Sequence, residues 1–234
     1  MADSRGRFAR RQRTRRLVAL RPVLIVAAVI LLGLGAVWML LYSHWLALQT
    51  VEVAGVDRLS SKQIERAAAL PAGSALARLD LDAAADRIEQ IPAVRSATLA
   101  RSWPHSVIIT VTERTPVAVV EVDGAFRAVD ATGAEFKLKG GQHGLPKLAV
   151  DPVSGTLDDA AEVVASLPAE IAQRVTEVRA DSIDSITLAL RSGDQVLWGS
   201  ADASSRKAQV LAVLLRHHAT QYDVSVPDQP TITR

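Results

Sequence analysis

The chain has no cysteine among its 234 residues. This absence excludes a disulfide-stapled scaffold, cysteine-ligated zinc sites, iron–sulfur clusters and a thiol nucleophile. It leaves the cellular compartment open, because a chain of this length can bury a core large enough to fold without disulfides. With 49% hydrophobic residues, the chain as a whole is not intrinsically disordered.

Charge is absent from one segment and unevenly divided over the rest of the chain. Residues 1–21 hold eight arginines and one acid, a net charge of +7, whereas residues 22–42 carry no charge. The remaining residues carry a net charge of −5, so the basic pI of about 9.2 arises from the N-terminal tail alone. A basic pI with this origin does not indicate a nucleic-acid partner.

The charge-free segment 22–42 is predicted to be a single transmembrane helix. Its 21 residues, twelve of which are Leu, Ile or Val, would span about 31 Å as a helix. Trp38, Tyr42 and Trp45 lie at its far end, where an interfacial aromatic belt is expected. The arginines before it keep the N-terminus cytoplasmic, in contact with membrane lipid, and place residues from 43 onward outside the cytoplasm.

Three alternatives to a membrane span are open. A buried core helix is disfavoured by the length of the charge-free run. A cleaved signal peptide has a shorter apolar region and small residues at its cleavage site, and residues 43–49 offer no such site. Arg15-Arg16 also resembles a twin-arginine export signal, but adjacent arginines are expected in a tail this basic.

After a spacer at 43–50, residues 51–116 are predicted to form a small α+β module of order β-α-α-β-β. Residues 51–53 alternate as a strand, and Ser60 with Gln63 marks the start of a helix. A second helix covers residues 81–88 and ends before Pro92. Two strands follow at 94–101 and 106–113, with Val107, Ile109 and Val111 on one face.

Residues 117–234 are predicted to form a mixed, β-rich domain with packed helices. Asp123-Gly124 is a strong two-residue hairpin signal, residues 139–146 indicate a loop, and Pro168 opens a further helical turn. Val224 and Val226 are expected to share one face of a strand. Strands are predicted at 117–122, 125–129, 135–138, 175–180, 186–191, 195–198, 222–226 and 231–233, and helices at 158–167 and 204–218.

No catalytic, cofactor or metal motif stands out. His217 and His218 are adjacent, so on a helix their side chains point about 100° apart and make a poor metal pair. The other histidines, His44, His105 and His143, are scattered, and no metalloprotease, nucleophile-elbow or phosphate-binding motif occurs. No enzyme activity, metal or cofactor is therefore expected.

Two tryptophans have either a core role or a binding role. Trp103 lies in the turn between two predicted strands, where covering the sheet is favoured over contact with a partner. Trp198 follows Val196-Leu197 in a strand and is expected in the core. The final strand 231–233 is expected at a sheet edge, and an open edge can accept a strand from another chain.

The order of these elements resembles the FtsQ/DivIB family of bacterial cell-division proteins. Val51-Glu52-Val53-Ala54-Gly55 is similar to the first strand of the family's POTRA module. The alanine- and arginine-rich composition and the short N-terminal tail resemble the family members of high-GC Gram-positive bacteria. The other matching segments are Pro92 to Pro104, Ile109 to Ala118 with Glu113-Arg114, Val129-Asp130 with Gly133, Leu145-Pro146, Gly199 with Lys207, and Tyr222 to Pro227.

The resemblance implies a non-enzymatic scaffold at the division septum. Its expected partners are the bitopic proteins FtsB (DivIC) and FtsL, and its role is to link early divisome assembly to septal peptidoglycan synthesis. The POTRA part is implicated in recruitment, and the later domain in binding FtsB by strand addition. The predicted binding residues are Thr231, Ile232 and Thr233, with Tyr222, Val224 and Val226 on the paired strand.

Two other functions are open. A membrane-anchored extracytoplasmic cell-wall enzyme would require a cleft with a perturbed acid or a nucleophile. A POTRA protein of outer-membrane assembly would require a long run of barrel strands. Only 118 residues follow Pro116 and they include two helical stretches, which disfavours a barrel of that kind.

Overall fold

The computed structural model describes residues 21, 22, 24–39, 44–138, 144–150 and 155–234. Residues 21–22 and 24–39 are helical, and large apolar side chains of this helix, such as Leu24, Ile30 and Leu34, are exposed. No helix in the described part of the chain is long and apolar enough to cross a membrane. The predicted tail, except Arg21, and residues 23 and 40–42 of the predicted span lie outside the described residues.

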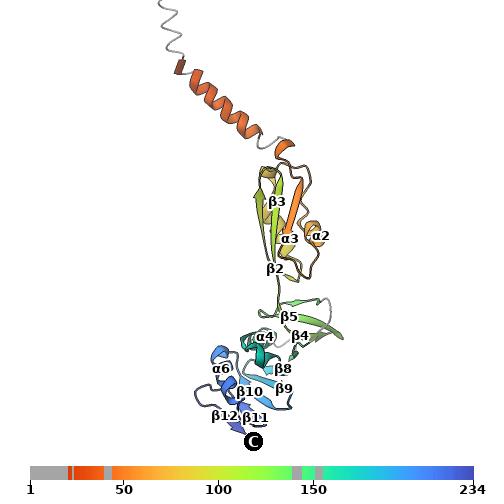
Figure 1. The fold of residues 1–234 in the computed structure, drawn as a ribbon, viewed down its shortest axis with the longest axis vertical. Coiled ribbons are helices and arrows are strands. Elements are labelled where there is room, and N and C mark those ends of the chain that lie inside the picture. The colour runs from red at the N-terminus through yellow and green to blue at the C-terminus, as the bar shows by residue number, and fades with distance from the viewer. Residues whose placement is uncertain (1–20, 23, 40–43, 139–143, 151–154) are drawn as a thin grey trace, which may run out of the picture.

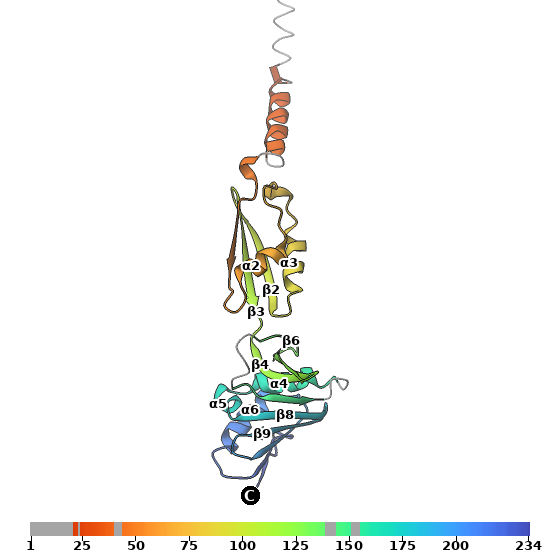
Figure 2. The same ribbon diagram turned by 90° about the vertical axis from the view of Figure 1, so that its right-hand side faces the viewer.

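Three parts follow one another along the long axis of the molecule: the N-terminal helix, a first unit at residues 50–113 and a second unit at residues 116–233 (Figures 1 and 2). A 3-10 helix, η1 (His44–Leu46), precedes the first unit. The C-terminus lies at the end of the molecule far from the N-terminal helix (Figure 1).

The first unit has the predicted β-α-α-β-β order. Two α-helices pack on a three-stranded sheet of order β1-β3-β2, in which β1 runs parallel and β2 antiparallel to β3. The elements are β1 (Thr50–Ala54), α2 (Ser61–Ala68), η2 (Leu76–Arg78), α3 (Leu81–Glu89), β2 (Val94–Ser102) and β3 (Ser106–Glu113).

Local sequence signals explain where the two helices of the first unit start. Ser60 caps α2, since its hydroxyl accepts the Gln63 N–H at 3.3 Å, as the spacing of these residues predicts. Asp80 caps α3 in the same way through the Ala83 N–H at 3.0 Å. The predicted apolar face of β3 is buried at Val107, Ile109 and Val111, which pack against residues such as Ile64, Leu76 and Ile88.

The second unit is built on one nine-stranded sheet of order β12-β11-β10-β9-β8-β7-β4-β5-β6. The pairs β4–β7, β7–β8 and β10–β11 are parallel and the others antiparallel. Its strands are β4 (Pro116–Val122), β5 (Ala125–Asp130), β6 (Glu135–Phe136), β7 (Lys147–Val150), β8 (Val175–Ser182), β9 (Ser185–Leu190), β10 (Gln195–Gly199), β11 (Gln221–Asp223) and β12 (Thr231–Thr233).

Three helices accompany this sheet: α4 (Leu157–Ser166), α5 (Ala169–Ala172) and α6 (Ser204–Leu214). In β9, alternate residues face them: Ile186, Leu188 and Leu190 are buried, and Thr187 and Ala189 are only partly covered. These buried residues form a core with the apolar side chains of α4 and α6. The α+β fold class is therefore confirmed for both units.

One predicted turn is confirmed, and several predicted strands and helices differ from the observed ones. The Asp123-Gly124 turn is confirmed, because both residues have positive φ as a type I′ hairpin requires. Strand β7 is absent from the prediction, because its four residues directly follow a glycine-rich segment. Strand β6 ends at Phe136 instead of 138, α6 ends at Leu214 instead of 218, and β11 ends at Asp223 instead of 226.

The structure confirms the prediction for Trp198 and shows that Trp103 is half exposed. Trp198 is fully buried, and its Nε1 donates a hydrogen bond to Ser204 Oγ at 3.2 Å, which confirms its place in the core. Trp103 lies in the turn between β2 and β3 and is 50% exposed. Half of its surface is thus covered and half is free for contact, so the preference for a sheet-covering role over a partner-binding role stays a prediction.

Candidate interaction edge

The candidate site is the edge of the nine-stranded sheet that β12 forms, whereas β6 is the terminal strand at the other end of the sheet. This strand is the last in the sheet order and pairs antiparallel with β11. Opposite residues in the pair are Gln221 and Thr233, Tyr222 and Ile232, and Asp223 and Thr231. All three residues of β12 are exposed, so within the described part of the chain its outer side faces no other strand.

The predicted pairing of the final strand with residues 222–226 is thus correct for Tyr222 and Asp223 only, and the observed pairing also includes Gln221. The Val224 N–H still donates to the Leu197 carbonyl of β10 at 2.9 Å, but the Asp223 side chain accepts the Ser225 N–H at 2.9 Å and the Ser225 hydroxyl at 2.6 Å, which turns the chain away from the sheet. This Asx turn ends the strand. As a result Val224 is buried and Val226 is 56% exposed, so the prediction that they share a strand face is wrong.

Tyr222 supports the edge from inside. Its side chain is buried, and its hydroxyl donates to the His217 carbonyl at 2.9 Å and accepts the Ala219 N–H at 3.3 Å. These bonds join β11 to the segment that follows α6. Tyr222 and Val224 therefore hold the edge in place, whereas Thr231, Ile232 and Thr233 are the residues available for contact.

Side chains on β12 alternate between the two faces of the sheet. Ile232 lies opposite Tyr222, on the face that carries the helices, and is 36% exposed. Thr231 and Thr233 point to the other face. A strand added beside β12 would therefore meet one apolar position flanked by two hydroxyl-bearing positions.

Two further contacts brace β12, and sequence reasoning missed both. Arg206 on α6 forms an ion pair with Asp228 in the loop before β12, which ties the loop to the helix. The Thr233 carbonyl accepts hydrogen bonds from the Thr220 N–H at 2.9 Å and the Thr220 hydroxyl at 3.2 Å. The Asp223-x-Ser225 spacing was a readable turn signal, whereas the Arg206–Asp228 pair depends on the fold.

Behind the edge, Gly199 and Lys207 occupy a tight position between β10 and α6. Gly199 has a positive φ of +77°, and a Cβ there would lie 3.0 Å from the Ser225 Cβ. Lys207 is buried, and its Nζ donates to the Ser200 carbonyl at 2.8 Å. Burial lowers the pKa of Lys207, although the charge of Asp202 opposes this shift. Both landmarks of the sequence therefore shape the interior rather than the binding surface.

The described histidines are spread along the structure. His105 lies in the β2–β3 turn of the first unit, whereas His217 and His218 follow α6 in the second. His143 lies outside the described residues. Across residues that the structure describes, no group of three or more His, Asp or Glu could hold a metal ion.

Comparison with known proteins finds two protein families and several relatives that this chain is similar to. Residues 46–114 match the family described as POTRA domain, FtsQ-type, and residues 118–228 match the family described as cell division protein FtsQ/DivIB, C-terminal. Cell division protein FtsQ of Streptomyces venezuelae is 38% identical over 98% of this chain and 90% of its own length.

A more distant relative and a solved structure are also similar. Cell division protein FtsQ of Mycobacteroides abscessus is 32% identical over 90% of this chain and 68% of its own length. The extracytoplasmic domain of the cell division protein DivIB from Geobacillus stearothermophilus aligns with 46% of this chain and 98% of its own, at 20% identity and a TM-score of 0.34.

Proposed function

This chain belongs to the FtsQ/DivIB family of cell division proteins, and on that premise we propose that it is a non-enzymatic scaffold of the division complex. In this proposal it binds FtsB (DivIC)-like and FtsL-like proteins at the septum and links early assembly to septal peptidoglycan synthesis. The observation that carries the proposal is the position of β12 at the open edge of the sheet.

The physical basis of binding is strand addition. An extended segment of the partner would pair its backbone N–H and C=O groups with those of β12, and side chains would supply selectivity. Thr231, Ile232 and Thr233 are the proposed contact residues. Tyr222 and Val224 hold the edge from behind. Val226 is exposed in the loop before β12, where it can contribute apolar contact.

We assign the parts of the chain to this role as follows. Residues 1–21 form a cytoplasmic basic tail, residues 22–42 a single transmembrane helix and residues 43–50 a spacer. Residues 51–116 form the extracytoplasmic POTRA domain, and residues 117–234 the domain that carries the binding edge. The twelve Leu, Ile and Val residues of segment 22–42 and the arginines before it support this arrangement.

The test removes the edge strand. A chain ending after Pro227 lacks β12, and we expect it to insert and fold but to lose capture of the FtsB/DivIC-like protein of the same organism in co-purification. A chain lacking only Arg234 keeps all of β12 and serves as the control. Capture by the shorter chain at the level of the control would refute the edge assignment.

Localisation is tested separately. A fluorescent protein fused to the N-terminus should give a band at the division septum in growing cells. A uniform envelope signal would contradict a role in the division complex. A septal band, combined with capture of the FtsB/DivIC-like protein by the chain that ends after Pro227, would contradict only the assignment of β12 as the binding edge.

A further inference from the structure

The two units are joined by a very short connection. Strand β3 ends at Glu113 and β4 begins at Pro116, so only Arg114 and Thr115 lie between them. The proline ring fixes the φ angle of Pro116 and restricts Thr115 to extended conformations. The connection is therefore stiff, but a stiff pair of residues does not alone determine how one unit is rotated against the other.

Apolar packing does not settle the orientation either. Among described residues, the hydrophobic cores of the two units share no buried side chain. A groove of about 630 Å³ separates the units on one side, and the residues that line it include Leu59, Ile91 and Pro92 of the first unit and Phe136 and Leu138 of the second. Domains with such limited apolar contact move relative to each other unless another interaction holds them.

Glu113, the last residue of β3, is fixed within the first unit. Its Oε1 accepts backbone N–H groups from Asp57 at 3.0 Å, Arg58 at 3.1 Å and Leu59 at 2.9 Å, and its Oε2 pairs with Arg58 Nε at 3.4 Å. Burial alone raises the pKa of Glu113, but these hydrogen bonds and the charge of Arg58 outweigh it and lower the pKa below its ordinary value.

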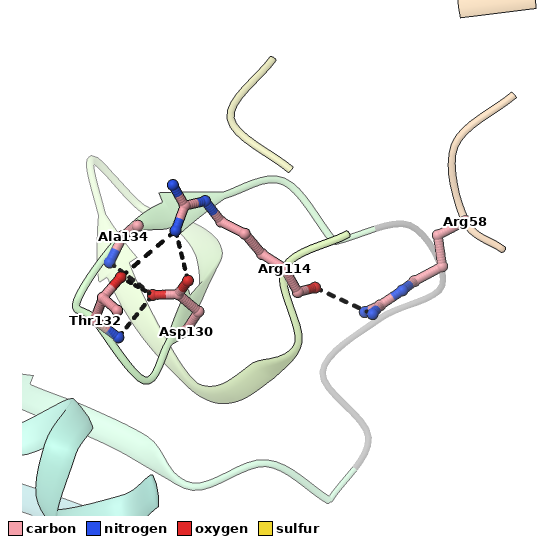
Figure 3. A network of polar contacts seen from close by, with 5 residues as sticks. All are labelled: Arg58, Arg114, Asp130, Thr132 and Ala134. Carbon is pink, nitrogen blue, oxygen red and sulfur yellow. Dashed lines mark hydrogen bonds and ion pairs between the residues drawn. The ribbon is translucent and has the colours of Figure 1, made fainter. Parts of the chain in front are cut away.

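The backbone of Arg114 is fixed to the same unit. Its N–H donates to the Ala93 carbonyl at 2.9 Å, and its own carbonyl accepts a hydrogen bond from Arg58 Nη2 at 3.1 Å. Arg58 therefore contacts both Glu113 and Arg114, as the right-hand part of Figure 3 shows for Arg114. These contacts leave the Arg114 backbone little freedom to turn.

The side chain of Arg114 reaches into the second unit. Its Nη1 donates to Asp130 Oδ2 at 2.6 Å and to Thr132 Oγ1 at 3.5 Å (Figure 3). Asp130 is buried, and its Oδ1 accepts the Thr132 N–H, the Thr132 hydroxyl and the Ala134 N–H at 2.9, 2.7 and 3.1 Å. The carboxylate is thus a fixed part of the turn between β5 and β6.

We infer that Glu113, Arg114 and Asp130, with Arg58, form a clamp that holds the two units in one relative orientation. Glu113 and Arg58 fix the end of the first unit, and the Arg114 guanidinium joins that end to the buried carboxylate of the second unit. The clamp lies beside the groove and far from β12 in the sheet order, so this inference does not depend on what binds at the edge.

The test measures the distance between the units in the full-length chain. Because the chain has no cysteine, the pair Glu65→Cys on α2 and Asp184→Cys in the β8–β9 turn gives two unique and exposed sites for spin labels. Electron–electron double resonance then reports the distance distribution. We expect one narrow distribution in the otherwise unchanged chain.

Arg114→Ala should broaden this distribution about twofold, since it removes the contact between the units and frees their motion. Glu113→Gln weakens the contacts that fix the end of the first unit, and it should broaden the distance distribution less than Arg114→Ala does. Arg179→Ala removes an exposed ion pair with Glu177 on the open face of the sheet and should leave the distribution unchanged. Circular dichroism confirms that each variant is folded.

If Arg114→Ala does not fold, Asp130→Asn and Glu113→Gln carry the test. A distribution that is already broad in the unchanged chain would overturn the inference. So would folded Arg114→Ala or Asp130→Asn chains whose distribution matches that of Arg179→Ala.

Discussion

Replacing Asp130 by asparagine should destabilise the second unit through the loss of one charge-assisted contact. The introduced amide has nearly the same shape as the Asp130 carboxylate, and its oxygen can still accept the Thr132 and Ala134 N–H groups. The amide nitrogen then takes the place of Oδ2, and because it is a donor it cannot accept from Arg114 Nη1, so the 2.6 Å charge-assisted contact is lost. Both partners are largely buried there, with side-chain exposures of 22% for Arg114 and 5% for Asp130.

A hydrogen bond to a charged group contributes about 1.5–3 kcal/mol, and we expect a loss of this size. Equilibrium urea unfolding of the full-length chain at pH 7 measures it. Trp198 is the one tryptophan that is wholly buried, since Trp38, Trp45 and Trp103 are each at least half exposed. The shift of its emission therefore follows unfolding of the second unit.

Glu121→Gln is the matched control. Glu121 pairs with Lys147 Nζ at 2.8 Å, but both side chains are 42% exposed, and exposed pairs of this kind contribute about 0–1 kcal/mol. The reasoning fails if Asp130→Asn costs no more than Glu121→Gln. It also fails if Asp130→Asn costs the same in a chain that already carries Arg114→Ala, because the contact would then not be the source of the loss.

Two further predictions concern the same region. Glu113 and Asp130 have pKa values below their ordinary 4.5 and 3.8, so each carboxylate contributes stability that is fully present above its ordinary value and is lost as pH falls through its lowered one. The spin-label distribution should therefore stay narrow at pH 4.5 and above, and broaden only at lower pH. Broadening above pH 4.5 would contradict this. Gly133→Ala should lower the urea midpoint of unfolding by more than Gly124→Ala. Both glycines have positive φ, and this backbone conformation costs about 1–2 kcal/mol for alanine. Only at Gly133 would the new Cβ also lie 1.9 Å from Asp158 Oδ1 and 3.1 Å from the Asp158 Cα. Equal midpoints in the two variants would show that Asp158 moves freely.

The fold of the first unit was largely readable from the sequence, because its signals are local. Caps at helix starts and the alternation of Val107, Ile109 and Val111 act within a few residues of one another. The Asp123-Gly124 hairpin was readable for the same reason. Each of these features is set by the backbone preferences of neighbouring residues rather than by distant contacts.

The predictions that were wrong concern segments whose structure depends on contacts between residues far apart in the sequence. Strand β7 is held by parallel pairing on both sides, with β4 and β8, and four residues carry too little pattern to reveal it. Val224 and Val226 alternate as a strand would, but the Asp223 side chain turns the chain away first. For the candidate edge, the sequence indicated the order of its strands, whereas the Arg206–Asp228 brace depends on α6 and the loop before β12 meeting in space.

The way Arg114 is held also bears on the order of folding. Every strand and helix of the first unit precedes Arg114 in the chain, so this unit can complete its core while later residues are still being synthesised. Ala93 and Arg58 would then already fix the Arg114 backbone, and its guanidinium would extend toward the growing chain. The β4–β5 hairpin, which ends in Asp130, is the next segment to form. We therefore expect the finished first unit to act as a template that orients the first hairpin of the second.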